Sequence, residues 1–451
     1  MFKIRLNPNA RPLVKASHAA RKCYQSKPPK WGDMIDVEGR LFGPSHHTTL
    51  EHNLYSFDIE GVSIGDITFG MHLANPFYNT DQRSGRYCAK MFLEPNFREI
   101  KKYIRTFWPE VNEREIKNVL GYIKKGVMIY HQNIGKATEI STELIKKERP
   151  LVSAGNLDAN APKIAQEQMR MFISLIFPTG VDFSVDLVSL FSMYHSAWTP
   201  SMRHITDEMV KKILRKFPEV DFMFQRKFPK QWEMKMPSAD SIKIKYKPSL
   251  KLLNIEGIED FVLPPSEIMY PIDLLHFLPD TMNNNTGGIR TKIEISAATM
   301  GQDQRHRTIG RGEPKFTGNF YLPPILRRMK MEKEALGLMN QWLSVSQNIP
   351  NSLAMILAPY GAMVTYKKRG SFNAVAHEQG KRLCFCAQEE IYHLGRMLRL
   401  AIQKKGEKYE KLLQIFEPPC YRAGKCIEGL RYCGRDIELR LIGDYFPERN
   451  I

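Results

Sequence analysis

The sequence predicts an α+β protein made of two similar units, each with a mixed β-sheet packed against long helices. Apolar residues alternate along residues 54–59, as they do in a half-buried strand, and a second strand-like run spans residues 293–298. Between about residues 113 and 147, apolar residues recur at the spacing of one helix face. A spacing shared by the two halves is the third observation, and it indicates a repeated unit.

The repeat joins each predicted strand to a histidine. The same number of residues separates Ile59 from His72 and Ile293 from His306. Each half then reaches an aromatic-Leu-x-Pro sequence, at residues 92–95 and 321–324. The echo is faint, so chance remains an alternative to duplication.

The first unit is predicted to span residues 1–224. Its features, in order, are a basic helix, a His-rich segment, the first strand, a polar turn, the long helix and two apolar stretches: residues 15–24, 46–52, 54–59, 81–87, 113–147, 165–176 and 185–194.

A change of composition separates the two units. In residues 225–265, lysines alternate with apolar residues along 242–247, and prolines recur at positions 229, 237, 248, 264 and 265. This pattern predicts a basic, Pro-containing linker with one strand in it. The second unit would then span residues 266–451, with helices at 332–345 and around 391–402.

The charge favours anionic partners. The chain has 66 Lys and Arg against 48 Asp and Glu, which leaves a net charge of +18. Nucleotides, folates and nucleic acids all fit, and charge alone does not choose among them. No apolar run approaches the roughly 20 residues needed to cross a bilayer, and the first residues lack a signal-peptide pattern, so we expect a cytoplasmic protein.

Five of the seven cysteines lie near the C-terminus: Cys384, Cys386, Cys420, Cys426 and Cys433. Their spacing differs from the Cys-x-x-Cys pairs of a zinc ribbon. In a cytoplasmic chain, free thiols are the expected state, and zinc is the weaker alternative. We therefore predict no metal site.

Two short segments carry residues suited to phosphates and flat rings. In Gln302-Asp303-Gln304-Arg305-His306-Arg307, the guanidinium groups offer planar forks of donors. In Ser84-Gly85-Arg86, the glycine lets an anion approach the backbone while the hydroxyl and the guanidinium donate hydrogen bonds. The alternatives are a solvated basic turn for the first segment and an ordinary turn for the second.

With these segments in view, the chain resembles the flavin-dependent thymidylate synthases (ThyX). Members of that family are similar in having His-x-Thr-x-x-Glu-His, Gln-x-x-Arg-His-Arg, Ser-Gly-Arg-Tyr and a late Gln-x-Glu-Ile segment. The matching residues here are 47–52 and 84–87 in the first half, and 302–307 and 382–391 in the second half. Each half lacks a motif that the other half keeps. In the first half, Met71-His72-Leu73 stands in place of Arg-His-Arg, and in the second half, Gly312-Glu313-Pro314 stands in place of Ser-Gly-Arg.

The resemblance implies a diverged tandem duplication. A single family unit is about half this length, and family members form homotetramers whose active sites combine several subunits. Two copies of this chain, as a homodimer, would then imitate a homotetramer.

The resemblance also implies the roles of residues. Arg305, Gln302 and Arg382 would be catalytic, holding and polarising a pyrimidine ring. His52, Arg305, His306 and Arg307 would bind the flavin. The substrate would be bound by Gln82, Ser84, Gly85, Arg86, Gln302 and Arg382.

In the family, FAD carries the hydride, methylenetetrahydrofolate gives the one-carbon unit and NADPH gives the reducing power. The implied reaction is one-carbon transfer to carbon 5 of a pyrimidine deoxynucleotide, from dUMP to dTMP. One alternative keeps the fold and the flavin but changes the outcome, for example to hydroxymethylation of dUMP. Another is a non-catalytic basic scaffold that binds nucleic acid through residues 225–251.

Overall fold

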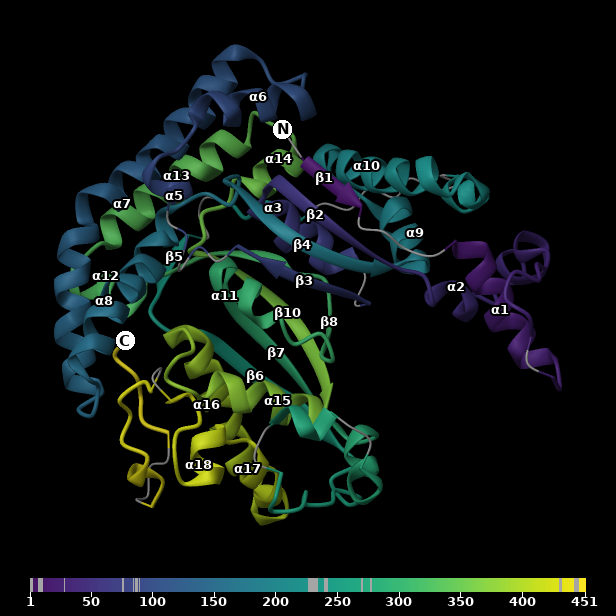
Figure 1. The fold of residues 1–451 in the computed structure, drawn as a ribbon. Helices are drawn as coiled ribbons and strands as arrows, with labels where there is room; N and C mark the ends of the chain where they lie inside the picture. The colour runs from purple at the N-terminus through teal and green to yellow at the C-terminus, as the bar shows by residue number, and fades with distance from the viewer. Residues whose placement is uncertain are drawn as a thin grey trace.

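The computed structural model contains two β-sheets that share one layer of long helices (Figure 1). The predicted α+β fold is confirmed. The structure describes residues 3–6, 11–27, 29–74, 77–83, 85, 88, 90–225, 234–238, 242–268, 271–275, 278–429, 432–441 and 446–451.

The first sheet has the strand order β1-β2-β4-β3, and all its neighbouring strands are antiparallel. The β2–β4 pair runs from Leu54 opposite Asp186 to Ser63 opposite Pro178. Alternate residues of β2 are buried, as the sequence pattern predicts. The strands are β1 (Lys3–Leu6), β2 (Leu54–Ser63), β3 (Tyr78–Gln82) and β4 (Pro178–Asp186).

The second sheet has the order β5-β9-β10-β7-β6, with β8 beside β10. Only β5 is parallel to its neighbour among the pairs that the described residues form. Read from β6, the order β6-β7-β10-β9 corresponds strand for strand to β1-β2-β4-β3. The strands are β5 (Lys243–Lys245), β6 (Ser249–Glu256), β7 (Gly288–Ser296), β8 (Gly310–Arg311), β9 (Lys315–Tyr321) and β10 (Ala362–Ser371).

Part of the segment expected to be a linker belongs to the second sheet. Residues 243–245 and 249–256 form β5 and β6, the two outer strands. Their lysines alternate with half-buried apolar residues because such strands have one face on the core and one in solvent. The predicted segment 225–265 thus contains two strands of the second sheet, where the sequence predicted one strand.

Helices in the first half surround the first sheet and form the long outer layer. The longest helix, α7, starts with a capping box. Asn112 Oδ1 accepts a hydrogen bond from the Glu115 amide at 3.0 Å, and Glu115 Oε2 accepts one from the Asn112 amide at 3.0 Å. The helices are α1 (Pro12–Tyr24), α2 (Thr48–Glu51), α3 (Ile64–Asp66), α4 (His72–Ala74), α5 (Lys90–Leu93), α6 (Phe97–Phe107), α7 (Glu113–Glu148), α8 (Ala154–Met169), α9 (Leu187–Ser196) and α10 (Pro200–Lys216).

Helices in the second half cover the second sheet and continue into the C-terminal region. Helix α13 packs along α7, and α16 lies against the second sheet (Figure 1). They are α11 (Ala297–Asp303), α12 (Pro324–Arg328), α13 (Glu332–Ser346), α14 (Asn351–Ile356), α15 (Phe372–Arg382), α16 (Glu389–Gln403), α17 (Glu410–Ile415) and α18 (Pro419–Ala423).

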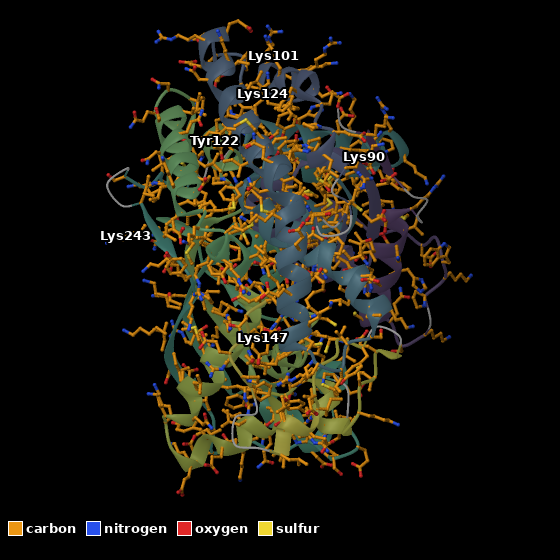
Figure 2. The ribbon with its side chains drawn as sticks, turned by 90° about the vertical axis from the view of Figure 1, so that its left-hand side faces the viewer. Lys90, Lys101, Tyr122, Lys124, Lys147 and Lys243 are labelled. Carbon is orange, nitrogen blue, oxygen red and sulfur yellow. The ribbon has the colours of Figure 1, made fainter. Side chains whose placement is uncertain are left out.

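One apolar core joins the two halves. Phe69 packs edge-on against Phe316, with ring centroids 5.6 Å apart. Buried hydrogen bonds also cross the boundary: the Tyr122 hydroxyl donates to the Leu357 carbonyl at 2.8 Å. In Figure 2, α7 runs along the viewed face from Lys124 to Lys147, above this core. The two halves are therefore packed together through this shared core, and each half also has a smaller apolar cluster of its own.

No helix in the described part of the chain is both long enough and apolar enough to span a membrane.

Candidate functional site

A cavity of about 240 Å³ lies where the two halves meet, and we call it the interface cavity. The first half contributes the end of β3 and the end of α8, and the second half contributes α11, the end of α15 and the segment before α16. Its polar lining residues are Thr68, Gln82, Arg83, Glu167, Arg170, Gln302, Arg305 and Arg382. Amide groups and cations from both halves thus face one volume.

Two elements of the first half position its side of the cavity. Gln82 ends β3, and the buried Gly85 follows it, held where Gln166 Nε2 donates to the Gly85 carbonyl at 2.8 Å. Arg170 follows the C-terminal end of α8, and its guanidinium carbon lies 5.0 Å from the centre of the Tyr360 ring. The Tyr360 ring of the second half thus holds the Arg170 guanidinium of the first half over its aromatic face.

A chain of hydrogen bonds orders the side of the second half. Arg382 Nη2 donates to the Gln302 carbonyl at 2.7 Å, and Gln302 Nε2 donates to Gln388 Oε1 at 2.5 Å. Gln388 Oε1 also accepts from Arg170 Nη2 at 3.3 Å. One amide, Gln388, therefore connects a side chain of each half, so the geometry of the cavity depends on how the halves are packed.

Beneath Gln388 lies the buried carboxyl of Glu390. It accepts hydrogen bonds from the Ser296 amide at 2.6 Å and from the Ser296 and Thr299 hydroxyls at 2.5 Å. Burial raises the pKa of Glu390 to about 7, although these donors act in the opposite direction. This carboxyl is poised to change its charge near neutral pH, one residue layer from the cavity.

Asp303 anchors the segment that carries Arg305. Its fully buried carboxylate accepts from Arg311 Nε at 2.5 Å, from the Tyr366 hydroxyl at 2.8 Å and from Lys368. Burial by itself raises the pKa of Asp303, but the charges of Arg311 and Lys368 outweigh it, so the pKa lies well below its usual range. The anchor therefore stays ionised and fixes the backbone before Arg305.

His306 faces a second cavity, of about 400 Å³, which we call the cysteine cavity. Neither ring nitrogen of this buried histidine has a hydrogen-bond partner among the described residues. Burial, with the charge of Arg382, lowers the pKa of His306 well below its usual range, so the ring is neutral. The cysteines that line the cysteine cavity are Cys384, Cys386, Cys420, Cys426 and Cys433.

The interface cavity adjoins two larger spaces. It shares Arg305, Arg382, Cys386 and Ala387 with the cysteine cavity. It shares Cys386, Ala387 and Glu167 with a third cavity of about 480 Å³, which Arg149, Lys163 and Arg449 also line. The residues before α16 therefore stand at the meeting point of three spaces, which suits ligands longer than one ring system.

Comparison with known proteins gives a family for the first half. Residues 6–220 match the family model Thy1, described as thymidylate synthase complementing protein. These residues belong to the ThyX family. The match ends before Gln302, Arg305 and Arg382, which lie in the second half of the chain.

Two solved structures are similar to this chain. One is thymidylate synthase X of Helicobacter pylori with FAD and dUMP, at 19% identity, covering 50% of this chain and 98% of its own, with a TM-score of 0.32. The other, flavin-dependent thymidylate synthase ThyX of the same organism complexed with FAD and dUMP, has 20% identity, covers 49% and 98%, and has a TM-score of 0.28. No functionally curated protein matches the sequence.

Most residues that the ThyX resemblance selects lie together. Gln82, Gly85, Gln302, Arg305 and Arg382 all line the interface cavity, and His306 lines the cysteine cavity beside it. Ser84 and Arg86 lie outside the described residues. The roles assigned to these residues stay predictions.

Arg307 and His52 lie elsewhere, and neither lines any of these three cavities. Arg307 Nη2 donates to the Thr80 carbonyl at 3.1 Å, and its guanidinium carbon lies 5.1 Å from the Tyr78 ring centre. In this position the side chain joins the two halves instead of facing a ligand space. His52 is exposed at the end of the short helix α2.

Sequence reasoning missed Arg170 and Glu390 as parts of the site. Arg170 directly precedes the largely apolar run 171–177, and that contrast was the available signal. Glu390 follows Gln388 and Glu389, so its surroundings in the sequence gave no such contrast. The apolar stretch predicted at 165–176 also continues past the end of α8, which is at Met169, so it did not separate Arg170 from the helix.

All seven cysteines are free thiols. Among the residues that the structure describes, no group of three or more His, Cys, Asp or Glu side chains is arranged to hold a metal ion.

Proposed function

We propose that this chain is a flavin-dependent, thymidylate-synthase-like enzyme that transfers a one-carbon unit to carbon 5 of dUMP. Its co-substrates would be methylenetetrahydrofolate and NADPH. The observation that supports this most is the interface cavity, where the two incomplete motifs meet: Gln82 and Gly85 from one half, and Gln302, Arg305 and Arg382 from the other. The family match of residues 6–220 supports the same reaction class.

The lining chemistry suits a pyrimidine nucleotide. Arg305 and Arg382 offer charge-assisted donors for a phosphate or for ring carbonyls. Gln82 and Gln302 can each donate to and accept from the amide edge of a pyrimidine. A fixed cation beside a ring carbonyl stabilises negative charge that develops on the ring, which favours reaction at carbon 5.

The residues present also fit a flavin. His306 is buried, neutral and without hydrogen-bond partners for either ring nitrogen among the described residues, beside a space with an aromatic wall at Phe385. Such a group can donate to one polar edge of a planar ring and accept from another. His306 and Arg305 would hold the cofactor, and the bound reduced flavin would supply the hydride.

We further propose that the chain arose by tandem duplication, with units at about 1–224 and 266–451. The equal strand orders of the two sheets support it. In this reading a homodimer imitates a homotetramer, and sedimentation equilibrium of the purified chain should give twice the chain mass. A monomer would contradict the assembly but would leave the site within each chain intact.

The test of the function is the colour and the product of the purified protein. We expect a yellow protein that releases FAD on denaturation and that, with dUMP and the two co-substrates, yields dTMP by mass spectrometry. A product one oxygen heavier than dTMP would indicate hydroxymethylation of dUMP instead. A colourless protein that ignores added FAD and retains nucleic acid would contradict the proposal in favour of a basic scaffold.

A further inference from the structure

The cysteine cavity gathers five of the seven cysteines of the chain. Cys23 and Cys88 lie outside it. Within the cavity, the exposed Cys386 thiol is hydrogen-bonded to both Cys384 and Cys433. The Cys386 backbone amide also donates to Cys384 Sγ at 3.4 Å. Three cysteines from two separate segments of the chain therefore lie side by side in the wall of one cavity.

The surroundings of Cys433 favour its thiolate. The hydrogen bond from Cys386 is the largest cause, and the Arg435 backbone amide and the charges of Arg149 and Arg435 add to it against the effect of burial. Together they lower the pKa of Cys433 to about 6. Glu428 also lines the cavity, and a negative charge there would oppose the thiolate. A thiolate at neutral pH is the reactive form of cysteine.

The two segments are held in place independently of these sulfurs. Cys386 lies in the segment between α15 and α16, and Cys433 lies in the C-terminal region. Arg435, which is buried, stacks on Phe385 and on Tyr421 at 4.3 Å from each ring centre. Arg449 Nη1 donates to the Ala387 carbonyl at 2.9 Å. These cationic contacts keep Cys433 beside Cys386 when the sulfurs are not bonded.

We propose that Cys433 and Cys386 form a thiol–disulfide exchange site for low-molecular-weight disulfides. The Cys433 thiolate attacks one sulfur of the small disulfide, forms a mixed disulfide and releases the other half as a thiolate. Cys386 loses its proton to that thiolate and attacks the sulfur of Cys433, which releases the second half. Two protein thiols are oxidised to one disulfide, and one small disulfide is reduced to two thiols.

The bond has a structural consequence for the neighbouring space. Cys386 lines the interface cavity as well as the cysteine cavity. Oxidation therefore ties one wall of the interface cavity to the C-terminal region. The inference does not depend on the flavin reaction, since it uses only the thiols and their surroundings.

The experiment treats the reduced full-length chain with oxidised glutathione at neutral pH and maps the peptides by mass spectrometry. We expect one Cys386–Cys433 disulfide and two glutathione molecules released per chain. Cys386→Ser should stop at a mixed disulfide on Cys433, and Cys433→Ser should slow the reaction by at least tenfold. Cys23→Ser and Cys88→Ser are the matched controls and should react like the wild type.

Three results would overturn the proposal: a Cys384–Cys386 disulfide as the main product, equal reaction of all seven cysteines, or stoichiometric bound zinc that protects the thiols. If a variant fails to fold, the proposal can still be tested on the wild type by the pH dependence of Cys433 alkylation. Alkylation of Cys433 by iodoacetamide should have a pH midpoint near 6. A midpoint near the ordinary thiol value of about 8.5 would contradict the site.

Discussion

The two histidines at the repeated position have opposite surroundings. The ring of His72 stacks on Tyr78, with centroids 5.3 Å apart, and it is hydrogen-bonded to Thr80 at 3.1 Å and to Gln304 at 3.3 Å. His306 has no hydrogen bond from its ring among the described residues and faces the cysteine cavity. Side chains of both halves thus fill the space around His72, whereas a cavity lies beside His306.

The difference shows how one duplicated frame can support one site. His72 is hydrogen-bonded to residues of both halves, so it helps to join them. His306 is buried but lines a cavity, so its ring nitrogens remain available to a ligand. We therefore expect one working site in each chain, at the interface cavity, with no second one around His72.

The two halves can also be compared at the starts of α3 and α11, where each half has a buried carboxyl group. In the first half, Asp66 accepts from the Thr199 and Ser201 hydroxyls at 3.0 and 2.7 Å. In the second half, Thr299 donates to Glu390, with carboxylate and hydroxyl on the opposite elements. Asp66 and Thr299 both follow a capping serine by three residues. The contact is the same in both halves, while donor and acceptor have changed places.

The largest effect should come from the cations of the interface cavity. Arg305→Ala and Arg382→Ala should each weaken dUMP binding by about 100-fold, and together by about 1000-fold, because each removes charge-assisted donors worth about 2–3 kcal/mol. Calorimetric titration measures this. The exposed Arg369→Ala, which breaks only the pair with Glu256, is the control and should bind normally.

The buried carboxyl of the second half should make stability depend on pH. Because the folded pKa of Glu390, about 7, is above its ordinary 4.5, the folded chain keeps a proton that the unfolded chain releases between these values. The free energy of unfolding should therefore fall as pH rises from about 4.5 to 7, by up to about 3 kcal/mol. Glu390→Gln should flatten this dependence in urea unfolding. An unchanged slope would contradict the assignment.

Exchanging each histidine for phenylalanine compares the two positions directly. His72→Phe should lower the free energy of unfolding by about 1–3 kcal/mol, because Thr80 and Gln304 lose their partner, and should leave flavin content unchanged. His306→Phe should change stability little and should reduce flavin content. Thermal unfolding and absorbance of released flavin measure the pair. The reverse pattern would remove the basis of the comparison.

The smallest effect should come from the surface contacts between the halves. Arg328 Nη2 pairs with Glu143 Oε1 at 2.7 Å, and both side chains are about half exposed to solvent. Arg328→Ala should change the free energy of unfolding by less than about 1 kcal/mol, since exposed ion pairs contribute little. A larger loss in urea unfolding would show that the halves depend on surface charges more than on their shared core.

Local patterns in the sequence predicted the elements that depend on local physics. The apolar spacing along residues 113–147 predicted the extent of α7 to within one residue, and the strand predicted at 54–59 lies within β2. The resemblance, and not spacing, led us to expect that Gln82 and Gly85 lie near Gln302 and Arg305, which line the same cavity. The position of Arg307 could not be predicted, because it depends on a tyrosine more than two hundred residues earlier in the chain.

Elements at a boundary were also hard to predict. The alternating lysines at 242–247 fit a linker and an outer strand equally well, and only the parallel pairing of β5 with β9 distinguishes them. The role of Arg170 in the site depends on its contact with Tyr360, which lies far away in the sequence. In both cases the missing information was a contact distant in sequence.

A crystal structure of the full chain with dUMP tests the central claim most directly, that both halves build one nucleotide site. We expect one nucleotide in each interface cavity, in contact with Gln82 or Gly85 on one side and with Arg305 and Arg382 on the other. A nucleotide bound by residues of one half alone, or in a cavity beside His72, would contradict the account.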